Sequence, residues 1–308
     1  MTKKLDKKPD LVFFAWIDLF LGNYLPHNLV NRLFPYPWSG LYLQPYHLRM
    51  QKKFANFRRG LLSDRGVLKS RNCRSVVVMD RAIAQKLQIE LKDKSVIVSP
   101  DITDLSPPSP DFDLAKQVKA KSKNRKIVGL LGSQGKRKGF LTMLEVSQKM
   151  KEQDFFFVFA GQPGYESFSP SELKRIGEVI DSSPENCFFH IQSIPDGSQF
   201  NALIDVCDII FVVYERYPFI SNILTKAAFF KKPVIASETF VIGETTQTYH
   251  LGITVPEGDV EKCIEALHDM TLSSKFDRQK YNRGCEKYNY SSSPEQFSRS
   301  IQKILNAI

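Results

Sequence analysis

The chain has 308 residues, which is long enough for two domains and too long for one comfortable hydrophobic core. Its 42% hydrophobic and 25% charged residues are typical of a globular protein and exclude an intrinsically disordered chain. The net charge of +10 is uneven: residues 1–125 hold 23 Lys and Arg against 11 Asp and Glu, whereas residues 126–308 hold 20 against 22. We therefore expect two domains. The basic amino-terminal half either meets an anionic lipid or acceptor or serves only solubility.

The five cysteines show neither C-x-x-C spacing nor a Cys/His pair at zinc-ligand spacing, and we interpret them as reduced thiols of a cytoplasmic protein. The apolar run Leu11–Leu21 contains Asp18 and is shorter than the roughly 20 apolar residues that a membrane-spanning helix needs. No small-residue cleavage site follows it, so a signal peptide is not expected. We predict a cytoplasmic protein, and association with the surface of a membrane is one of the two alternatives for its basic half.

The amino-terminal half alternates short apolar runs with helical patterns. Strands are predicted over Leu11–Ile17, Gly40–Leu43, Ser75–Met79 and Ser95–Val98, and helices over Asn28–Leu33, Tyr46–Arg59 and Arg81–Leu87. The second helix carries five cations that fit a membrane-surface face and a solvated face equally well: Arg49, Lys52, Lys53, Arg58 and Arg59. Residues 106–124 are rich in Pro and then in Lys and Ser, which is typical of a linker.

The carboxyl-terminal half shows this alternation more clearly. Strands are predicted over Lys126–Leu131, Asp154–Ala160, Cys187–Ile191, Asp208–Val213, Pro233–Ala236 and Gly252–Val255. Helices are predicted over Phe140–Met150, Ser171–Ile180, Ser198–Val206, Asn222–Phe230 and Val260–Met270, followed by two more within residues 274–308. Apolar runs that alternate with helices are typical of βαβ units and a parallel sheet, whose ligands bind at the carboxyl ends of the strands.

Two segments at that edge favour an anion site. The turn Gly132–Gly139 follows a strand and matches neither the dinucleotide fingerprint nor a P-loop. Its glycines nevertheless let backbone approach a phosphate, and Arg137 and Lys138 add positive charge. Ser221 or Asn222 begins a helix whose amino end offers a second dipole. The predicted phosphate-binding residues are Gly132, Ser133, Arg137, Lys138, Ser221 and Asn222.

The order of these motifs resembles the donor domain of GT-B glycosyltransferases, especially the large retaining family that includes sucrose synthases. The matching segments are Gly132 with Lys138-Gly139, Gly161–Gly164, Phe189–Ile194, Lys231–Ala236 and Gly252–Asp259. The resemblance covers roughly residues 124–272. It implies an α/β, GT-B-like fold of two Rossmann-like domains with parallel sheets, the amino-terminal one reduced.

The resemblance also implies a domain organisation and a function. An acceptor-side domain would span residues 1–105, a linker 106–124 and the donor domain 125–290, and a last helix over 291–308 would cross back to the first domain. We expect transfer of a sugar from a UDP- or GDP-sugar to a glycan, a lipid-linked glycan or a small molecule, without a metal or other cofactor. No nucleic-acid motif is present, so nucleic acid is not an expected partner. The oligomeric state stays open.

Further site residues follow from the resemblance. The base would contact Gly161, Gln192, Ser193 and Ile194, and Glu215 would contact the ribose or the sugar. Asp18 is the candidate catalytic residue on the acceptor side. Lys226 stands where the family has the second Glu of its E-x7-E pair. An ammonium only donates hydrogen bonds, so we expect Lys226 to bind phosphate. The alternative, a non-catalytic binding or scaffolding protein that lost this pair, stays open.

Overall fold

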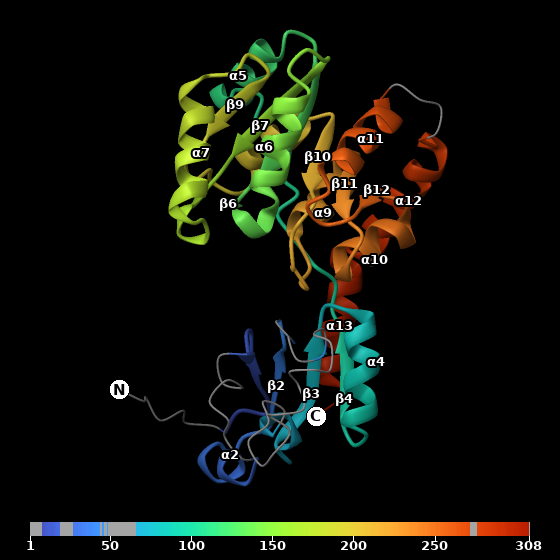
Figure 1. The fold of residues 1–308 in the computed structure, drawn as a ribbon. Coiled ribbons are helices and arrows are strands. Elements are labelled where there is room, and N and C mark those ends of the chain that lie inside the picture. Colours follow the sequence, from blue (N-terminus) through green and yellow to red (C-terminus); the bar gives the residue numbers. More distant parts are fainter. Residues whose placement is uncertain are drawn as a thin grey trace. The chain divides into compact units, whose positions relative to one another are not determined.

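The structure is a computed structural model that describes residues 8–18, 27–43, 45, 48, 66–271 and 276–307. The chain divides into two compact units, residues 1–101 with 292–308 and residues 102–291 (Figure 1). The five cations predicted on a helix over residues 46–59 lie outside the described residues. Among the helices that are described, none is long and apolar enough to cross a membrane.

The first unit contains a parallel sheet of four strands in the order β1 (Val12–Phe14), β2 (Trp38–Leu41), β3 (Cys73–Val78) and β4 (Ser95–Val98). The other elements among its described residues are α2 (His27–Leu33), η1 (Val67–Lys69), α4 (Arg81–Glu90) and α13 (Pro294–Leu305). The core is apolar, with Leu68, Val76 and Leu87 fully buried. The four strands predicted in this half are therefore present, although the first is shorter than predicted.

Helix α13 packs in this unit against strand β4. The Ser293 side chain accepts the Gln296 N–H and so caps the helix. Ile304 is buried against Val77 and Ile97, and the Ser300 hydroxyl donates to Ser99 Oγ at 3.3 Å. The amphipathic pattern of the last residues of the chain thus covers one edge of the first sheet.

The second unit contains a parallel sheet of six strands. The strands are β5 (Lys126–Leu131), β7 (Phe155–Ala160), β9 (Cys187–His190), β10 (Ile209–Val212), β11 (Val234–Ser237) and β12 (Gly252–Val255). Their order is β12-β11-β10-β5-β7-β9, which is the Rossmann order when counting starts at β5. The strand order reverses between β5 and β10, so the turns after these two strands meet at the switch point where such folds bind ligands.

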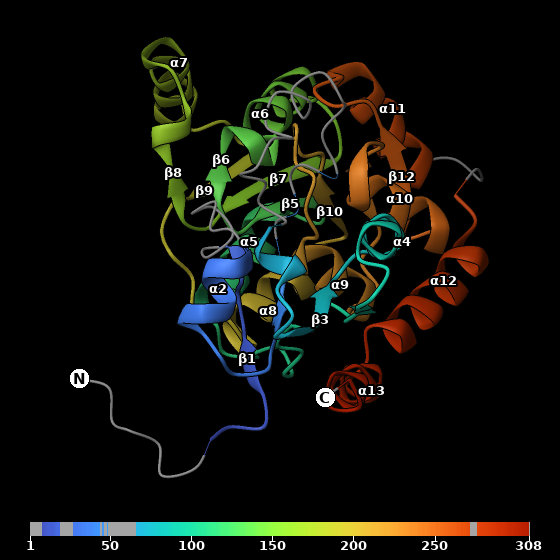
Figure 2. The ribbon, with the colours of Figure 1, turned by 90° about the horizontal axis from the view of Figure 1, so that it is seen from below.

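Helices cover both faces of this sheet (Figure 2). One layer contains α5 (Asp113–Ser122), α8 (Ser198–Val206), α9 (Asn222–Phe229) and α12 (Arg278–Ser291), and the other contains α6 (Phe140–Lys149), α7 (Pro170–Asp181) and α11 (Val260–Thr271). Adjacent residues of β7 face opposite layers, and both Val158 and Phe159 are completely buried. The predicted α/β fold with parallel sheets is confirmed.

Three local predictions are corrected. The segment expected to be a linker includes helix α5, because Leu114, Val118 and Ser122 recur at helical spacing and bury one face among the lysines. Helix α7 begins at Pro170, one residue before the predicted start, and is capped by Ser169 in a capping box with Glu172. Helix α10 (Phe240–Tyr249) was not predicted, because its β-branched residues and Gly243 weaken the helical signal.

The five cysteines are free thiols, four of them buried and Cys187 half-buried. Burial raises the pKa of the Cys187 thiol to about 11 and those of Cys73, Cys207 and Cys263 to about 12. These thiols are therefore protonated and unreactive at neutral pH.

Candidate functional site

The turns that follow β5 and β7 are locked together at the carboxyl edge of the second sheet. Gly161 has φ +139°, and a Cβ atom there would lie 1.9 Å from the Gly132 carbonyl oxygen. The Gly132 N–H donates to the Ala160 carbonyl at 3.0 Å. The buried Gln134 amide nitrogen lies 3.0–3.1 Å from the Leu130, Gly132 and Ala160 carbonyl oxygens. The turn that was predicted to approach a phosphate is thus held by backbone contacts.

The next residues, η2 (Lys136–Lys138), bring the cations of this turn onto the end of β10. Gly139 has φ +77°, and a Cβ atom there would lie 2.2 Å from the Val213 carbonyl oxygen. The Glu215 N–H donates to the Arg137 carbonyl at 2.9 Å. Glycine is therefore required where the two loops meet.

The three cations of η2 differ in their partners. Lys136 pairs with Glu172 at 2.5 Å. The Lys138 ammonium lies 4.0 Å from the ring centroids of both Tyr214 and Tyr217, and the exposed Arg137 lies over Tyr217 at 5.4 Å. Within the described parts of the chain, neither Arg137 nor Lys138 forms an ion pair with a carboxylate. Both are therefore free to neutralise an anion.

Lys138 is the most perturbed of these groups. Burial, with a smaller contribution from the neighbouring Arg137, lowers the pKa of Lys138 to about 7. A bound anion would offset both causes and raise that pKa again. A half-buried lysine held on two aromatic rings and lacking a described carboxylate partner is electrostatically suited to a phosphate group.

The amino end of α9 lies beside the Gly132 turn. A Cβ atom on Gly132, whose φ is +95°, would lie 3.9 Å from Ile223 Cδ1. Ser221 precedes the helix and is buried, and its hydroxyl lies 3.4 Å from the Tyr214 hydroxyl without capping the helix. Asn222 and Ser133 are exposed. The fold therefore gathers six of the seven predicted phosphate residues, all but Lys226, at one edge of the sheet.

The predicted base loop follows β9 and lies next to Gly161. The Gly161 N–H donates to the His190 carbonyl at 2.9 Å, which connects the second turn to the third. Gln192 and Ser193 are exposed, whereas Ile194 packs against the core. Two of these side chains are thus accessible to a ligand, and the base-binding role remains a prediction.

Glu215 lies in a cavity of about 330 Å³ with Glu145, Arg216 and Glu257. Its carboxylate accepts the Thr142 hydroxyl at 3.3 Å. Glu257 accepts the Arg216 N–H at 2.8 Å and also the Thr239 hydroxyl. Glu257 was not predicted as a site residue, although the segment Gly252–Asp259 contains it, and neither were the two tyrosines that support Lys138. All three lie within four residues after the end of a predicted strand.

Lys226 does not bind phosphate in the way that was predicted. Its side chain is completely buried, and its ammonium lies 2.6 Å from the Asp104 carbonyl oxygen, 2.8 Å from Asn201 Oδ1 and 3.1 Å from Asp196 Oδ1. The ammonium donates hydrogen bonds to the first two acceptors and forms an ion pair with the third, so its charge is compensated inside the protein. The correction has a simple reason: this face of α9 packs against α8, which contains Asn201, and not against the glycine turn.

Asp18 belongs to the first unit and follows β1. One of its carboxylate oxygens accepts the Leu43 N–H at 2.8 Å. This bond joins the loops after β1 and β2, which are adjacent parallel strands. A role in catalysis remains a prediction.

Comparisons with known proteins identify the fold through solved structures. No protein-family model matches the sequence, and no curated protein matches it. HepE from Anabaena in complex with UDP matches with a TM-score of 0.73 at 14% identity, over 97% of this chain and 79% of HepE. Sucrose-phosphate synthase from Thermosynechococcus elongatus matches with a TM-score of 0.69 at 16% identity, over 96% and 73% of the two chains. A glycosyltransferase from Rickettsia africae matches with a TM-score of 0.61 at 17% identity, over 96% and 76%. The fold is therefore that of GT-B glycosyltransferases.

Proposed function

We propose that this protein is a glycosyltransferase that binds a UDP- or GDP-sugar at the carboxyl edge of the second sheet and transfers the sugar to an acceptor. The observation that carries the proposal is the Lys138 ammonium, which is half-buried on two tyrosines, has a lowered pKa and has no carboxylate partner in the described residues. The HepE structures with UDP and with UDP-glucose support the choice of donor class, since their fold is shared.

The proposed chemistry depends on charge. When the bond between sugar and diphosphate breaks, negative charge develops on the leaving diphosphate. Lys138, Arg137 and the amino end of α9 would stabilise that charge without a metal, and such preorganised contacts lower the barrier because they need no reorganisation. Glu215 would accept hydrogen bonds from the sugar or the ribose, and Gln192 and Ser193 would contact the base. The acceptor would bind the first unit, where Asp18 is the candidate catalytic group.

Thermal shift with UDP and GDP tests the donor site. Binding only to the folded state stabilises it, by about 2.7 kcal/mol when the ligand is at 100 times its Kd. Lys138→Ala should weaken nucleoside diphosphate binding by about tenfold or more, because it removes a charged contact. Lys136→Ala is the matched control, since Lys136 is in the same turn but is paired with Glu172. The absence of a shift with either nucleotide at millimolar concentration would exclude the donor site.

A second function is favoured by one observation. Lys226 stands at the position where the family it resembles has a ribose-binding Glu, and its protons are used inside the protein. A non-catalytic protein that binds a nucleotide sugar would show this pattern. Release of free sugar from UDP-glucose or GDP-mannose, followed over hours, distinguishes the two functions: an enzyme hydrolyses the donor slowly, and a binding protein leaves it intact.

A further inference from the structure

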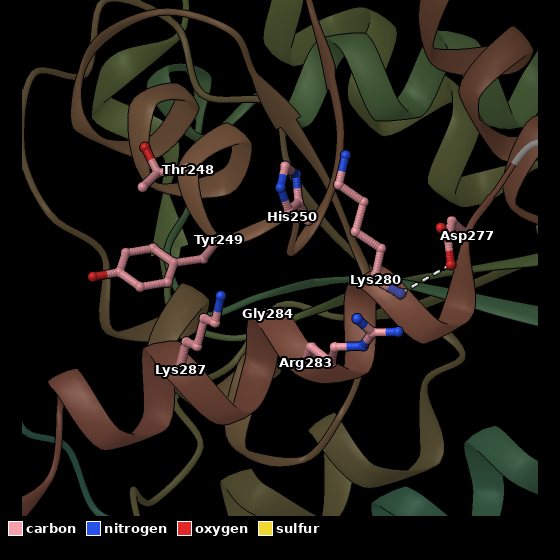
Figure 3. Close-up of a pocket in the computed structure, with 8 residues that line it drawn as sticks. All are labelled: Thr248, Tyr249, His250, Asp277, Lys280, Arg283, Gly284 and Lys287. Atoms are coloured by element: carbon pink, nitrogen blue, oxygen red, sulfur yellow. Dashed lines mark hydrogen bonds between the residues drawn. The ribbon is translucent and has the colours of Figure 1, made fainter.

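A basic cavity of about 410 Å³ lies between the end of α10 and helix α12 in the second unit (Figure 3). His250 follows α10, and β12 begins two residues later. The cavity is therefore at the amino edge of the sheet, whereas the proposed donor site is at the carboxyl edge. Its volume is within the range of cavities that bind small molecules.

Close packing of the α12 backbone against the end of α10 shapes this cavity. Gly284 is buried in α12, and a Cβ atom there would lie 1.7 Å from the Tyr249 carbonyl oxygen. Glycine is thus needed for α12 to approach the end of α10. The Tyr249 and Tyr288 rings meet edge to face at 5.0 Å and fix the two helices together. The packing of α12 against the end of α10 therefore sets the shape of the cavity.

The charge of the cavity is net positive, because three cationic side chains line it against the single carboxylate of Asp277. Lys280, Arg283 and Lys287 lie at helical spacing on one face of α12, over about 10 Å of its axis. In the described residues none of the three forms an ion pair with a carboxylate. The Asp277 carboxylate accepts the backbone N–H of Lys280 at 2.9 Å, so it serves as the cap of α12. The carboxyl end of α10 offsets only about half a charge.

We propose that this cavity binds an anion that carries phosphate groups, at a site separate from the donor site. Figure 3 shows the Lys280 and Lys287 side chains extending to the same side of α12 as the His250 ring. Arg283 offers paired donors that match two phosphate oxygens, and the two lysines add point charges. Three permanent cations spread over this length suit a ligand with more than one negative charge. A soluble phosphorylated molecule and a phospholipid headgroup share this chemistry.

The test uses the full chain and a reporter inside the cavity. Pyrophosphate is titrated while the side-chain NMR signals of His250 are followed, which are assigned with the His250→Gln variant. The triple variant Lys280→Gln, Arg283→Gln, Lys287→Gln should weaken the response by about tenfold or more, since it removes three cationic contacts. The control variant Lys116→Gln, Lys119→Gln, Lys121→Gln removes the same charge from α5 and should leave the response unchanged.

A second arm uses vesicles of phosphatidylcholine with and without phosphatidic acid. Either response, to pyrophosphate or to phosphatidic acid vesicles, supports the proposal when the α12 triple variant loses it and the α5 control keeps it, and the arm that responds identifies the source of the phosphate. No response in either arm, or equal losses in the two triple variants, would overturn it. Because His250 is at the opposite sheet edge from Lys138, this outcome does not depend on whether the donor site exists.

Discussion

The Lys226 ammonium lies 3.1 Å from Asp196 Oδ1, although the Lys226 side chain is fully buried and the Asp196 side chain is 65% exposed. The pair joins helix α9 to the loop before α8, and the same ammonium donates hydrogen bonds to Asn201 Oδ1 and to the Asp104 carbonyl oxygen. The lysine therefore holds α9 against the loop that contains the proposed base-contacting residues. Its role is to position that loop.

Lys226→Ala should lower the free energy of unfolding by about 2–4 kcal/mol, because buried acceptors lose their donor. Asp196→Asn should cost less than about 1 kcal/mol, since this partner is largely exposed and the Asn amide oxygen can still accept from the ammonium. Urea denaturation of the two variants measures both values. If both substitutions have equal and small effects on the free energy of unfolding, the ammonium is not held by these three acceptors.

Lys226→Glu restores the residue type that the resembled family has at this position. We expect it to be less stable than Lys226→Ala, because a carboxylate would face Asn201 Oδ1, the Asp104 carbonyl and Asp196, all of which are acceptors. Denaturation together with a donor hydrolysis assay measures the outcome. If Lys226→Glu folds normally and hydrolyses the donor, Lys226 is a substitution that inactivated an ancestral active site.

Nucleoside diphosphate binding should weaken as the pH rises above about 7. The free protein loses the Lys138 proton near that pH, whereas the complex keeps it, so affinity falls by up to about tenfold per pH unit. Calorimetric titration with UDP from pH 7 to pH 9 measures this slope. Lys138→Arg keeps a permanent cation and should remove most of the slope, and an unchanged slope in that variant would assign the proton to another group.

Gly161→Ala should destabilise the protein and abolish UDP binding. The residue has a positive φ, and its Cβ would collide with the Gly132 carbonyl oxygen, so a cost of at least about 1–3 kcal/mol is expected from strain alone. Gly177→Ala in helix α7 is the control, since nothing lies within 4 Å of its Cβ and alanine favours a helix by up to about 1 kcal/mol. Thermal unfolding with and without UDP compares the two. Normal binding by Gly161→Ala would contradict the predicted turn contact.

The basic amino-terminal half predicts attraction to anionic membranes. The protein should co-sediment with phosphatidylserine vesicles at low salt and be released as salt shortens the range of electrostatic attraction. Neutralising Arg49, Lys52, Lys53, Arg58 and Arg59 together should reduce the bound fraction, whereas the α12 triple variant tests the other basic surface separately. If equal fractions of the protein sediment with neutral and with anionic vesicles, the positive charge serves only solubility.

The sheet of the second unit and the glycine-rich turn after β5 could be predicted from the sequence alone. Buried parallel strands such as β5 and β7 are continuous apolar runs, and the Gly132–Gly139 turn has a composition that few other local structures require. Both signals come from residues that are close together in the sequence, so a single sequence is enough to recognise them. The fold class could be predicted from them, since alternating strands and helices have few ways to cover both faces of a sheet.

The surroundings of Lys226, Lys138 and helix α5 depend on tertiary packing and could not be predicted from the sequence. Whether an ammonium meets phosphate or Asp196 depends on which face of α9 packs against α8, and residues far apart in sequence set that face. Tyr214 and Tyr217 reach Lys138 only because β10 pairs with β5. Helix α5 is stable because Leu114 and Val118 are buried in the core, although its composition resembles a linker. Pairing and burial between distant segments are not encoded in local spacing, and they determine which charges are free to bind a ligand.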